Sequence, residues 1–337
     1  MKIVFFEATE SDKKYLAPMF PNHEVLFFSE PLTAENKEKA RDAEIISVFI
    51  YSVVNKAIIE HLENARCIAT RSTGFDHIDI ASCAEKNIAV LNVPYYGENT
   101  VAEHTFALIL ALSRNVHKSY ARGLKENFSM QGLIGFDLKN KTLGVIGTGH
   151  IGLHVIRIAK GFGMHVLAYD VHHDIFLSEI LHFNYVSLDD VLAQSDIITI
   201  HVPYNEHTHH LISRENIKKI KPGSLLINTA RGGIVENGAL IEALDNHTLS
   251  GVGLDVLEGE EYIKEEQQCL YEDCDPVQAR QIEQNKNLLS RDNVVYTPHI
   301  GFYSEEALKR ILDTTIENIT QFTLGKIENS VILSKKK

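Results

Sequence analysis

The sequence predicts an α/β protein with two domains, each built on a parallel sheet. Short apolar segments typical of buried strands alternate with helical patterns from one end of the chain to the other. The chain has 337 residues, more than a single domain usually contains. A glycine-rich turn near the middle starts a second strand–helix series. Right-handed crossovers between parallel strands are expected in both series.

The first series contains five expected strands and at least three helices. The strands cover residues 2–8, 24–30, 44–50, 66–72 and 88–94, where apolar residues predominate. Helical patterns lie between them at 55–65 and 78–87. A longer stretch at 99–124 has apolar residues at three- and four-residue spacing, which predicts one long helix.

The second series contains six expected strands and ends in a helix. The strands cover residues 142–146, 165–170, 196–203, 224–231, 250–257 and 293–299. The helical pattern at 304–323 is expected to return to the first domain. The segment 258–292 is long, acidic and polar, which favours an excursion over the surface rather than a part of the core.

Composition and charge exclude several classes of partner. The net charge is -12 and no basic stripe is present, so a nucleic-acid partner is not expected. No signal peptide opens the chain, and no apolar run approaches the length of a membrane span. The four cysteines have neither metal-ligand nor redox spacing, so we expect no metal and reduced thiols in a cytoplasmic protein. They are Cys67, Cys83, Cys269 and Cys274.

The segment "LGVIGTGHIG" has the glycine spacing of a dinucleotide-binding loop. Gly147, Gly149 and Gly152 follow an apolar strand pattern and precede a helical one. The first glycine permits a tight turn, the second lets the backbone approach a pyrophosphate, and the third lets the helix pack on the strand. The free N–H groups of the helix N-terminus then suit the phosphates.

An acidic residue stands where such a loop requires one. Asp170 ends the next strand pattern, "HVLAYD", where a carboxylate binds the hydroxyl groups of the adenosine ribose. A carboxylate repels the 2′-phosphate of NADP, so we expect NAD as the cofactor. His172 and His173 follow and would soften this repulsion if protonated, although a surface position is the simpler interpretation.

Three further polar residues follow the last three strands. Arg231 ends "SLLINTAR", Glu260 lies five residues after Asp255 in "GLDVLEGEE", and His299 ends "NVVYTPH". Ligands of open parallel sheets bind at this edge. An arginine fork suits a carboxylate, and a histidine exchanges protons near neutral pH. Each alone is explained by a surface ion pair, a solvated charge or a structural role, but together, beside a nucleotide loop, they predict an active site.

The motifs "GTGHIG", "NTARGG", "GLDVLEGEE" and "TPHIGF" resemble those of the D-2-hydroxyacid dehydrogenase family, in the same order. The phrases "TPHIGFYSEEAL" and "AYD" are most similar to its D-lactate dehydrogenase branch. The resemblance implies two Rossmann/flavodoxin-like domains with the active site in the interdomain cleft. Residues 1–100 and 300–337 would form the substrate domain, and 101–299 the NAD-binding domain. The long helix around 100–123 would link the domains and help to form a homodimer.

The resemblance also implies roles for individual residues. His299 would be the acid/base, Glu260 would support it, and Arg231 would bind the substrate carboxylate. The substrate would also contact the backbone of Thr73 and Gly74, and Tyr96 and Phe302, with Phe49 or Tyr51 as further candidates. The implied cofactor-side residues are Gly147, Gly149, His150, Ile151, Gly152, Asp170, His201, Val202, Pro203, Thr229, Ala230 and Asp255, the last by the nicotinamide.

The expected function is reduction of pyruvate by NADH to D-lactate, or the reverse reaction. A dehydrogenase for a bulkier 2-keto acid or for 3-phosphoglycerate is an alternative, although no cationic cluster for a phosphate is evident in the first domain. A non-enzymatic NAD-sensing scaffold of the corepressor type would keep the same polar residues. Such a scaffold would be expected to carry partner-binding extensions, which this chain almost lacks.

Overall fold

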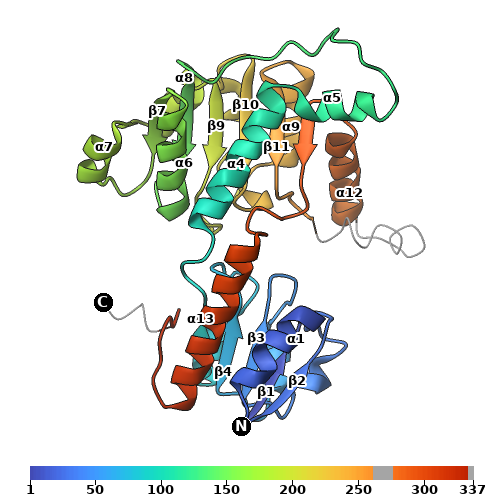
Figure 1. Ribbon diagram of the computed structural model, residues 1–337, viewed down its shortest axis with the longest axis vertical. Helices are drawn as coiled ribbons and strands as arrows, with labels where there is room; N and C mark the ends of the chain where they lie inside the picture. The colour runs from blue at the N-terminus through green and yellow to red at the C-terminus, as the bar shows by residue number, and fades with distance from the viewer. Residues whose placement is uncertain (261–275, 333–337) are drawn as a thin grey trace. The chain divides into compact units, whose positions relative to one another are not determined.

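The computed structural model describes residues 1–260 and 276–332. The chain forms two compact units, Met1–Tyr96 with Ser304–Lys337 and Gly97–Tyr303 (Figure 1). These junctions lie a few residues away from the expected ones at 100 and 300. Within the described ranges, no helix is both long enough and apolar enough to cross a membrane.

The first unit contains a five-stranded parallel sheet in the order β2-β1-β3-β4-β5. The chain starts in the interior of this sheet, and the order is that of flavodoxin-like folds. Each strand lies inside an expected segment. The strands are β1 (Lys2–Phe5), β2 (Glu24–Phe27), β3 (Ile45–Val48), β4 (Cys67–Thr70) and β5 (Ala89–Leu91).

Alternate side chains of these strands enter two separate cores, one on each face of the sheet. Ile3 and Phe5 lie in a core with α1 (Glu10–Leu16) and α13 (Glu305–Thr323). Val4 and Phe6 belong to the opposite core, to which α2 (Lys56–His61) and α3 (Ile80–Glu85) contribute. A period of two along the strand produces this division. Short 3-10 helices cover Ala17–Met19 and Lys37–Ala40.

The second unit contains a seven-stranded parallel sheet in the order β12-β11-β10-β9-β6-β7-β8. Its first strand, β6, lies in the interior of the sheet beside β7, and the chain later returns to place β9 on the other side of β6. The loops after β6 and β9 therefore diverge at the switch point where dinucleotides bind. The strands are β6 (Thr142–Ile146), β7 (His165–Tyr169), β8 (Asn184–Tyr185), β9 (Ile197–Ile200), β10 (Ser224–Asn228), β11 (Leu249–Leu254) and β12 (Val294–Tyr296).

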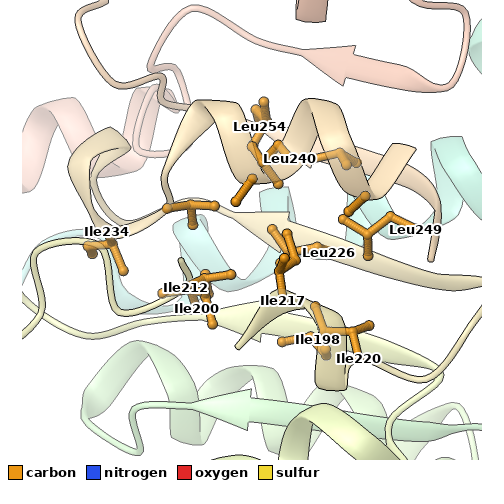
Figure 2. Close-up of a cluster of buried hydrophobic side chains, with 14 of the residues drawn as sticks. Ile198, Ile200, Ile212, Ile217, Ile220, Leu226, Ile234, Leu240, Leu249 and Leu254 are labelled. Atoms are coloured by element: carbon orange, nitrogen blue, oxygen red, sulfur yellow. The ribbon is translucent and has the colours of Figure 1, made fainter. Parts of the chain in front are cut away.

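Helices cover both faces of this sheet. The first layer, in front of the sheet in Figure 1, contains α4 (Glu98–Ser113) and α6 (His150–Gly161), which pack on Leu143 and Val145 of β6. The second contains α8 (Leu188–Gln194) and α9 (Asn237–Asp245). Figure 2 shows side chains of the core between the sheet and this second layer, including Leu226 of β10 and Leu240 of α9. Smaller elements are α7 (Ile175–Leu181) and 3-10 helices at Ile217–Lys219 and Gly232–Ile234.

The expected long helix at 99–124 is wrong, because the chain breaks into α4 and α5 (Val116–Gly123). Asn115 adopts a left-handed conformation with φ of 52°, which asparagine tolerates better than most residues. Its side-chain amide donates to the carbonyl oxygen of Ile134 at 3.1 Å. The helical pattern runs on across the break, so the turn is not evident in the spacing of apolar residues.

The surface excursion expected at 258–292 is wrong for its last part. Residues Pro276–Leu289 form a helix, α12, and Leu288 is fully buried in the core beside α9. The polar residues of α12 conceal this helix because only a few positions face the core. Residues 261–275, with Cys269 and Cys274, lie outside the described part of the chain; Cys67 and Cys83 are buried free thiols.

Candidate active site

The glycine loop joins β6 to α6 with the geometry that a pyrophosphate requires. Gly147 has φ of 97°, and a Cβ atom there would lie 2.7 Å from the backbone of His201. A Cβ atom on Gly152 would lie 2.0 Å from the Gly147 carbonyl oxygen, so α6 starts in direct contact with the turn. A Cβ atom on Gly149 would meet no atom within 4 Å. The loop is thus closed on the protein side and open at Gly149, which fits a dinucleotide.

The N-terminus of α6 is available to an anion. Gly149 is the N-cap residue, and no side chain caps the helix. The first-turn amide groups, which include those of Ile151 and Gly152, therefore have no N-cap side chain to accept their hydrogen bonds. Phosphate oxygens of a bound cofactor are suited to this end of the helix dipole.

Asp170, directly after β7, is fixed by the same loop. Its Oδ2 accepts hydrogen bonds from the amide of Thr148 at 2.7 Å and from the Thr148 hydroxyl at 3.1 Å, and its Oδ1 accepts from the amide of His172 at 3.0 Å. Burial alone would raise the pKa of Asp170, but these hydrogen bonds outweigh it and hold the pKa below its ordinary value. The group is a preorganised anion, suited to ribose hydroxyls and unsuited to a 2′-phosphate.

Tyr185 and His173 pack beside the contact between Thr148 and Asp170. The Tyr185 hydroxyl lies 2.9 Å from the Thr148 hydroxyl, and the His173 ring stacks on the Tyr185 ring at 4.3 Å between centroids. His172 and His173 are both exposed. Tyr185 was not evident from the sequence as part of this site, because it reaches Thr148 from β8, at the edge of the sheet.

His201, Val202 and Pro203 directly follow β9, across the switch point from the glycine loop. Val202 also approaches the turn, since a Cβ atom on Gly147 would lie 2.9 Å from its Cγ1. The Nε2 atom of His201 lies 2.9 Å from the Thr199 hydroxyl. Burial of the imidazole lowers the pKa of His201 to about 3. This ring is therefore neutral at physiological pH.

Arg231 lies in the turn after β10. Its backbone is held by Asn228, whose side-chain amide donates to the Arg231 carbonyl oxygen at 2.9 Å and accepts from the Ala230 amide at 3.0 Å. The guanidinium is half-buried and donates to the Ala230 carbonyl oxygen at 2.9 Å. The neighbouring Thr229 hydroxyl lies 3.0 Å from that of Thr105 on α4. The turn thus presents a fixed cation at the carboxyl edge of the sheet.

His299 and Glu260 are brought together from two different strand ends. The Nδ1 atom of His299, after β12, lies 3.1 Å from Oε1 of Glu260, after β11. Both side chains are partly exposed, at 19% and 29%. The other Glu260 oxygen, Oε2, accepts from the amide of Leu257 at 3.3 Å. An imidazole supported by a carboxylate at one nitrogen keeps the other nitrogen for proton transfer.

Phe302 lies beside this pair. It is buried, and its ring meets the His299 ring edge to face at 6.3 Å between centroids. Asp255 is 2% exposed and its carboxylate accepts hydrogen bonds from the segment that carries His299. Asp255 directly follows β11, as the strand pattern predicts, whereas its contacts to the backbone around His299 were not expected.

Glu258 is a part of the site that the sequence did not reveal. Its Oε1 lies 2.6 Å from Nε2 of His210, and its carbonyl oxygen accepts from Gln281 at 2.9 Å and Asn285 at 3.1 Å on α12. Asn237 of α9 also donates to this carbonyl oxygen, at 3.3 Å. These contacts fix the chain two residues before Glu260. They connect elements far apart in sequence, and "EGEE" gives no sign of them.

The remaining expected substrate residues belong to the first unit. Thr73 is held by its hydroxyl, which donates to the Val93 carbonyl oxygen at 2.7 Å, and by Asn92, which donates to the Thr73 carbonyl oxygen at 2.9 Å. The amides of Thr73 and Gly74 donate to no other residue that the structure describes. The Tyr96 carbonyl oxygen accepts from Arg310 at 2.7 Å. The loop at 73–74 therefore has backbone donors suited to an anion.

Phe49 and Tyr51 lie on a second loop of the first unit. Their amides donate to the carboxylate of Glu7 at 2.9 and 2.8 Å, and the Arg71 guanidinium lies 5.5 Å from the centre of the Phe49 ring. No cluster of metal-ligating side chains occurs in residues 1–260 and 276–332. The chemistry that the described side chains support is proton transfer beside a bound anion and a dinucleotide.

Comparison with known proteins agrees with this geometry. Residues 106–301 match the family model of the NAD-binding domain of D-isomer specific 2-hydroxyacid dehydrogenases. A 2-hydroxyacid dehydrogenase homolog of Haemophilus influenzae is 35% identical over 340 residues, which cover 99% of each chain. An aromatic 2-oxoacid reductase of Clostridium sporogenes is 38% identical over 288 residues, 85% of this chain and 84% of the relative.

Solved structures show the same similarity over both units. The crystal structure of D-lactate dehydrogenase from Aquifex aeolicus, complexed with NAD and lactic acid, has a TM-score of 0.89 and 36% sequence identity, and the match covers 98% of this chain and 99% of that one. The matched family model, the full-length relatives and the glycine loop with Asp170 agree on an NAD-dependent oxidoreductase. The chain belongs to the D-isomer specific 2-hydroxyacid dehydrogenase family.

Proposed function

We propose that this enzyme is a D-lactate dehydrogenase, which reduces pyruvate with NADH and catalyses the reverse oxidation. The observation that carries the proposal is the contact of 3.1 Å between His299 Nδ1 and Glu260 Oε1, at strand ends next to that of Arg231. This set supplies a proton donor, a group to orient it and a cation for a carboxylate. A 2-keto acid needs all three.

Different residues of the chain bind the cofactor, bind the substrate and transfer the proton. When bound, NADH supplies the hydride that is added to the carbonyl carbon of the keto acid. The glycine loop, the first turn of α6 and Asp170 hold the cofactor. Arg231 binds the substrate carboxylate through its planar fork. Protonated His299 gives its proton to the carbonyl oxygen, and neutral His299 takes it back in the oxidation.

Glu260 has a positioning role in this mechanism. Its contact with Nδ1 leaves Nε2 of His299 to exchange the proton with substrate. The negative charge of Glu260 also lies beside the imidazole when it is protonated. Phe302, packed edge to face on the His299 ring, restricts the movement of that ring away from this orientation.

Two observations bear on the identity of the keto acid. The Aquifex aeolicus enzyme, similar over both units, was solved with lactic acid, which favours pyruvate. The Clostridium sporogenes relative acts on aromatic 2-oxoacids, so a larger keto acid is the second candidate. Phe302 is buried against His299 and Tyr303. A bulky aromatic ring at this position favours a small substrate side chain.

The test is NADH consumption by the purified protein with pyruvate, phenylpyruvate and 3-phosphohydroxypyruvate, with NADPH as the cofactor control. Preference for pyruvate, with D-lactate as the product, supports the proposal. Turnover only on the aromatic or phosphorylated acid would keep the mechanism and replace the substrate. Binding of NADH without turnover of any acid would contradict the proposal and favour an NAD-sensing scaffold.

We further propose that the enzyme works as a homodimer in the cytoplasm. Large apolar side chains are exposed on α5 and the segment after it: Val116, Tyr120, Leu124, Phe128, Met130 and Ile134. Phe128 and Ile134 are 83% and 92% exposed, which a monomer rarely shows over so many neighbours. A contact from Arg122 to the Gln131 carbonyl oxygen at 2.6 Å folds this segment back on α5. The buried, free thiols of Cys67 and Cys83 suit a reducing compartment.

A further inference from the structure

The backbone at His299 is in a conformation that must be held in place. Its φ is 56°, in the left-handed region that few residues other than glycine adopt. His299 lies in the turn that follows the end of β12. A residue in this region persists only where the surroundings determine it, and such residues concentrate at functional sites.

Asp255 brackets this turn from both sides. Its Oδ1 accepts from the Thr297 hydroxyl at 2.5 Å and from the amide of Ile300 at 2.9 Å, and its Oδ2 accepts from the amide of Gly301 at 2.8 Å. Its backbone carbonyl oxygen accepts from the amide of His299 at 2.8 Å. The residues before and after His299, and His299 itself, are thus attached to one carboxylic acid residue.

A carboxylate this deeply buried needs a charged or polar partner. Neither lysine nor arginine pairs with Asp255 among residues 1–260 and 276–332; the basic side chain next to it is His104 of α4. The Nε2 atom of His104 lies 3.3 Å from Asp255 Oδ1 and 2.9 Å from the Thr297 hydroxyl. His104 comes from an element separated from Asp255 by most of the unit's sequence.

The number of protons on each group determines which atom donates and which accepts in these hydrogen bonds. The Thr297 hydroxyl has a single proton, which it donates to the carboxylate of Asp255, since a carboxylate only accepts. The hydroxyl must therefore accept from His104, and Nε2 of His104 carries a proton. The chain of donors runs from His104 through Thr297 to Asp255.

Gly301 completes this arrangement through its small size. A Cβ atom at this position would lie 2.8 Å from Asp255 Oδ2 and 3.5 Å from Cδ2 of His104. The segment can approach the carboxylate and the imidazole this closely only because no side chain stands between them.

We propose that His104 and Thr297 are positioning residues that hold the His299 turn on Asp255, so that the His299 ring stays within hydrogen-bonding distance of Glu260. They touch neither substrate nor cofactor in this role and act through the backbone of 297–301. The inference rests on the proposed acid–base role of His299. It predicts that proton transfer, rather than the binding of NADH or of the keto acid, depends on the Thr297 hydroxyl and on the His104 N–H group.

The test compares Thr297→Val, which removes the hydroxyl at nearly constant volume, with Thr297→Ser, which keeps it. For Thr297→Val we expect kcat to fall about 10- to 100-fold, as small misplacements of catalytic groups do. Thr297→Ser should keep kcat within roughly threefold of the wild type, and the KM for the keto acid should change little in either. NADH binding, followed by the fluorescence of NADH itself in a protein without tryptophan, should be unchanged.

A second pair, His104→Leu and His104→Gln, tests the other donor. Gln places an N–H group near the position of Nε2, so His104→Gln should recover most of the kcat that His104→Leu loses. Thermal unfolding of all four variants separates a general loss of folded protein from a loss of turnover by folded protein. A merely structural role would lower the folded fraction and leave the kcat per folded molecule unchanged, which would overturn the inference.

The decisive measurement is the same substitution in a second background. If Thr297 acts through His299, Thr297→Val should add little to the loss that His299→Ala already causes, because residues that act as a unit are not additive. An equal further fall in that background, or wild-type kcat for Thr297→Val alone, would overturn the inference. If His299→Ala itself kept kcat within about tenfold of the wild type, the proposed proton donor would fail instead.

Discussion

Gly232 lies against the backbone of Leu257, so closely that a Cβ atom at position 232 would be 2.0 Å from the Leu257 carbonyl carbon. The turn that carries Arg231 therefore packs directly on the chain that leads to Glu260. The neighbouring amide of Glu258 would be 2.3 Å from the same Cβ atom. Because both neighbouring groups are backbone atoms, neither can rotate away from a side chain at position 232. The absence of a side chain at Gly232 therefore determines how closely the loop of Arg231 approaches the loop that leads to Glu260.

Gly232→Ala should separate these two loops and lower activity. We expect kcat/KM for the keto acid to fall about 100-fold, the scale of loss from a shift near 1 Å. The control is Gly161→Ala at the end of α6, where a Cβ atom meets nothing within 4 Å and alanine favours the helix. Equal activity of the two variants would show that the loops tolerate the movement. Steady-state kinetics with matched folded concentrations measures the difference.

Asp170 should decide the choice of cofactor. Removing the charge in Asp170→Ala should raise the KM for NADH and reduce the preference for NADH over NADPH by about 10- to 100-fold, since a charged hydrogen-bond partner is worth about 1.5–3 kcal/mol. Tyr185→Phe, which removes only the hydroxyl next to Thr148, should have the same direction and a smaller effect. The ratio of kcat/KM for the two cofactors measures both. An unchanged ratio in Asp170→Ala would remove Asp170 from this role.

The sequence predicted most strands because their signal is local. The segments around β1, β6 and β10 are apolar runs long enough to be recognised without any knowledge of their neighbours. The break at Asn115 and the helix α12 were not predicted, because one depends on a single backbone conformation and the other on a few buried positions among polar ones. Local pattern does not contain either kind of information.

The candidate site divides in the same way. Gly147, Gly152 and Asp170 belong to one strand–helix–strand unit, so their spacing in sequence predicts their spacing in space. The contact of His104 with Asp255 joins α4 to a strand end far along the chain, and the contact of His210 with Glu258 joins two loops. Such pairs depend on the order of strands in the sheet, which the glycine motif does not specify.

His201 should make the folded enzyme sensitive to acid. Burial lowers its pKa to about 3 from an ordinary value of 6.5, so below pH 6.5 the unfolded chain binds a proton that the folded chain excludes. Stability from this group is present above pH 6.5 and is lost as the pH falls toward 3. The loss is at most about 1.4 kcal/mol per pH unit for one group.

The measurement is the free energy of unfolding in urea for the wild type and His201→Gln between pH 7.5 and about pH 4.5. Taking the difference between the two proteins at each pH cancels the other titrating groups. We expect the advantage of the wild type to shrink as the pH falls, because glutamine does not titrate. A difference that stays constant over this range would show that the His201 ring takes up its proton in the folded state.

The apolar segment at 116–134 should control assembly. Phe128→Asp combined with Ile134→Asp places charges at two of the three most exposed apolar side chains of this segment, and a homodimer that buries them should dissociate. Light scattering after size exclusion should then report the mass of one chain in place of two. Phe176→Asp, on the exposed face of α7 with 69% exposure, is the matched control and should remain a dimer. A monomeric wild type at micromolar concentration would contradict the proposed assembly.

Arg231→Lys should separate charge from geometry in substrate binding. A lysine keeps the positive charge but offers a point ammonium where the guanidinium offers a planar fork for a carboxylate. We expect the KM for pyruvate to rise and kcat to fall, with a combined loss in kcat/KM of about 100-fold, because the lost hydrogen bond is charged on both sides. NADH affinity should be unchanged, since the residues proposed to hold the cofactor, the glycine loop and Asp170, lie elsewhere on the sheet edge. The control is Arg291→Lys. In the wild type Arg291 forms an ion pair with Asp245 at 2.7 Å, and its replacement by lysine should leave the kinetics unaltered. If Arg231→Lys behaved like this control, Arg231 would act only as a diffuse positive charge, and other groups would have to orient the keto acid.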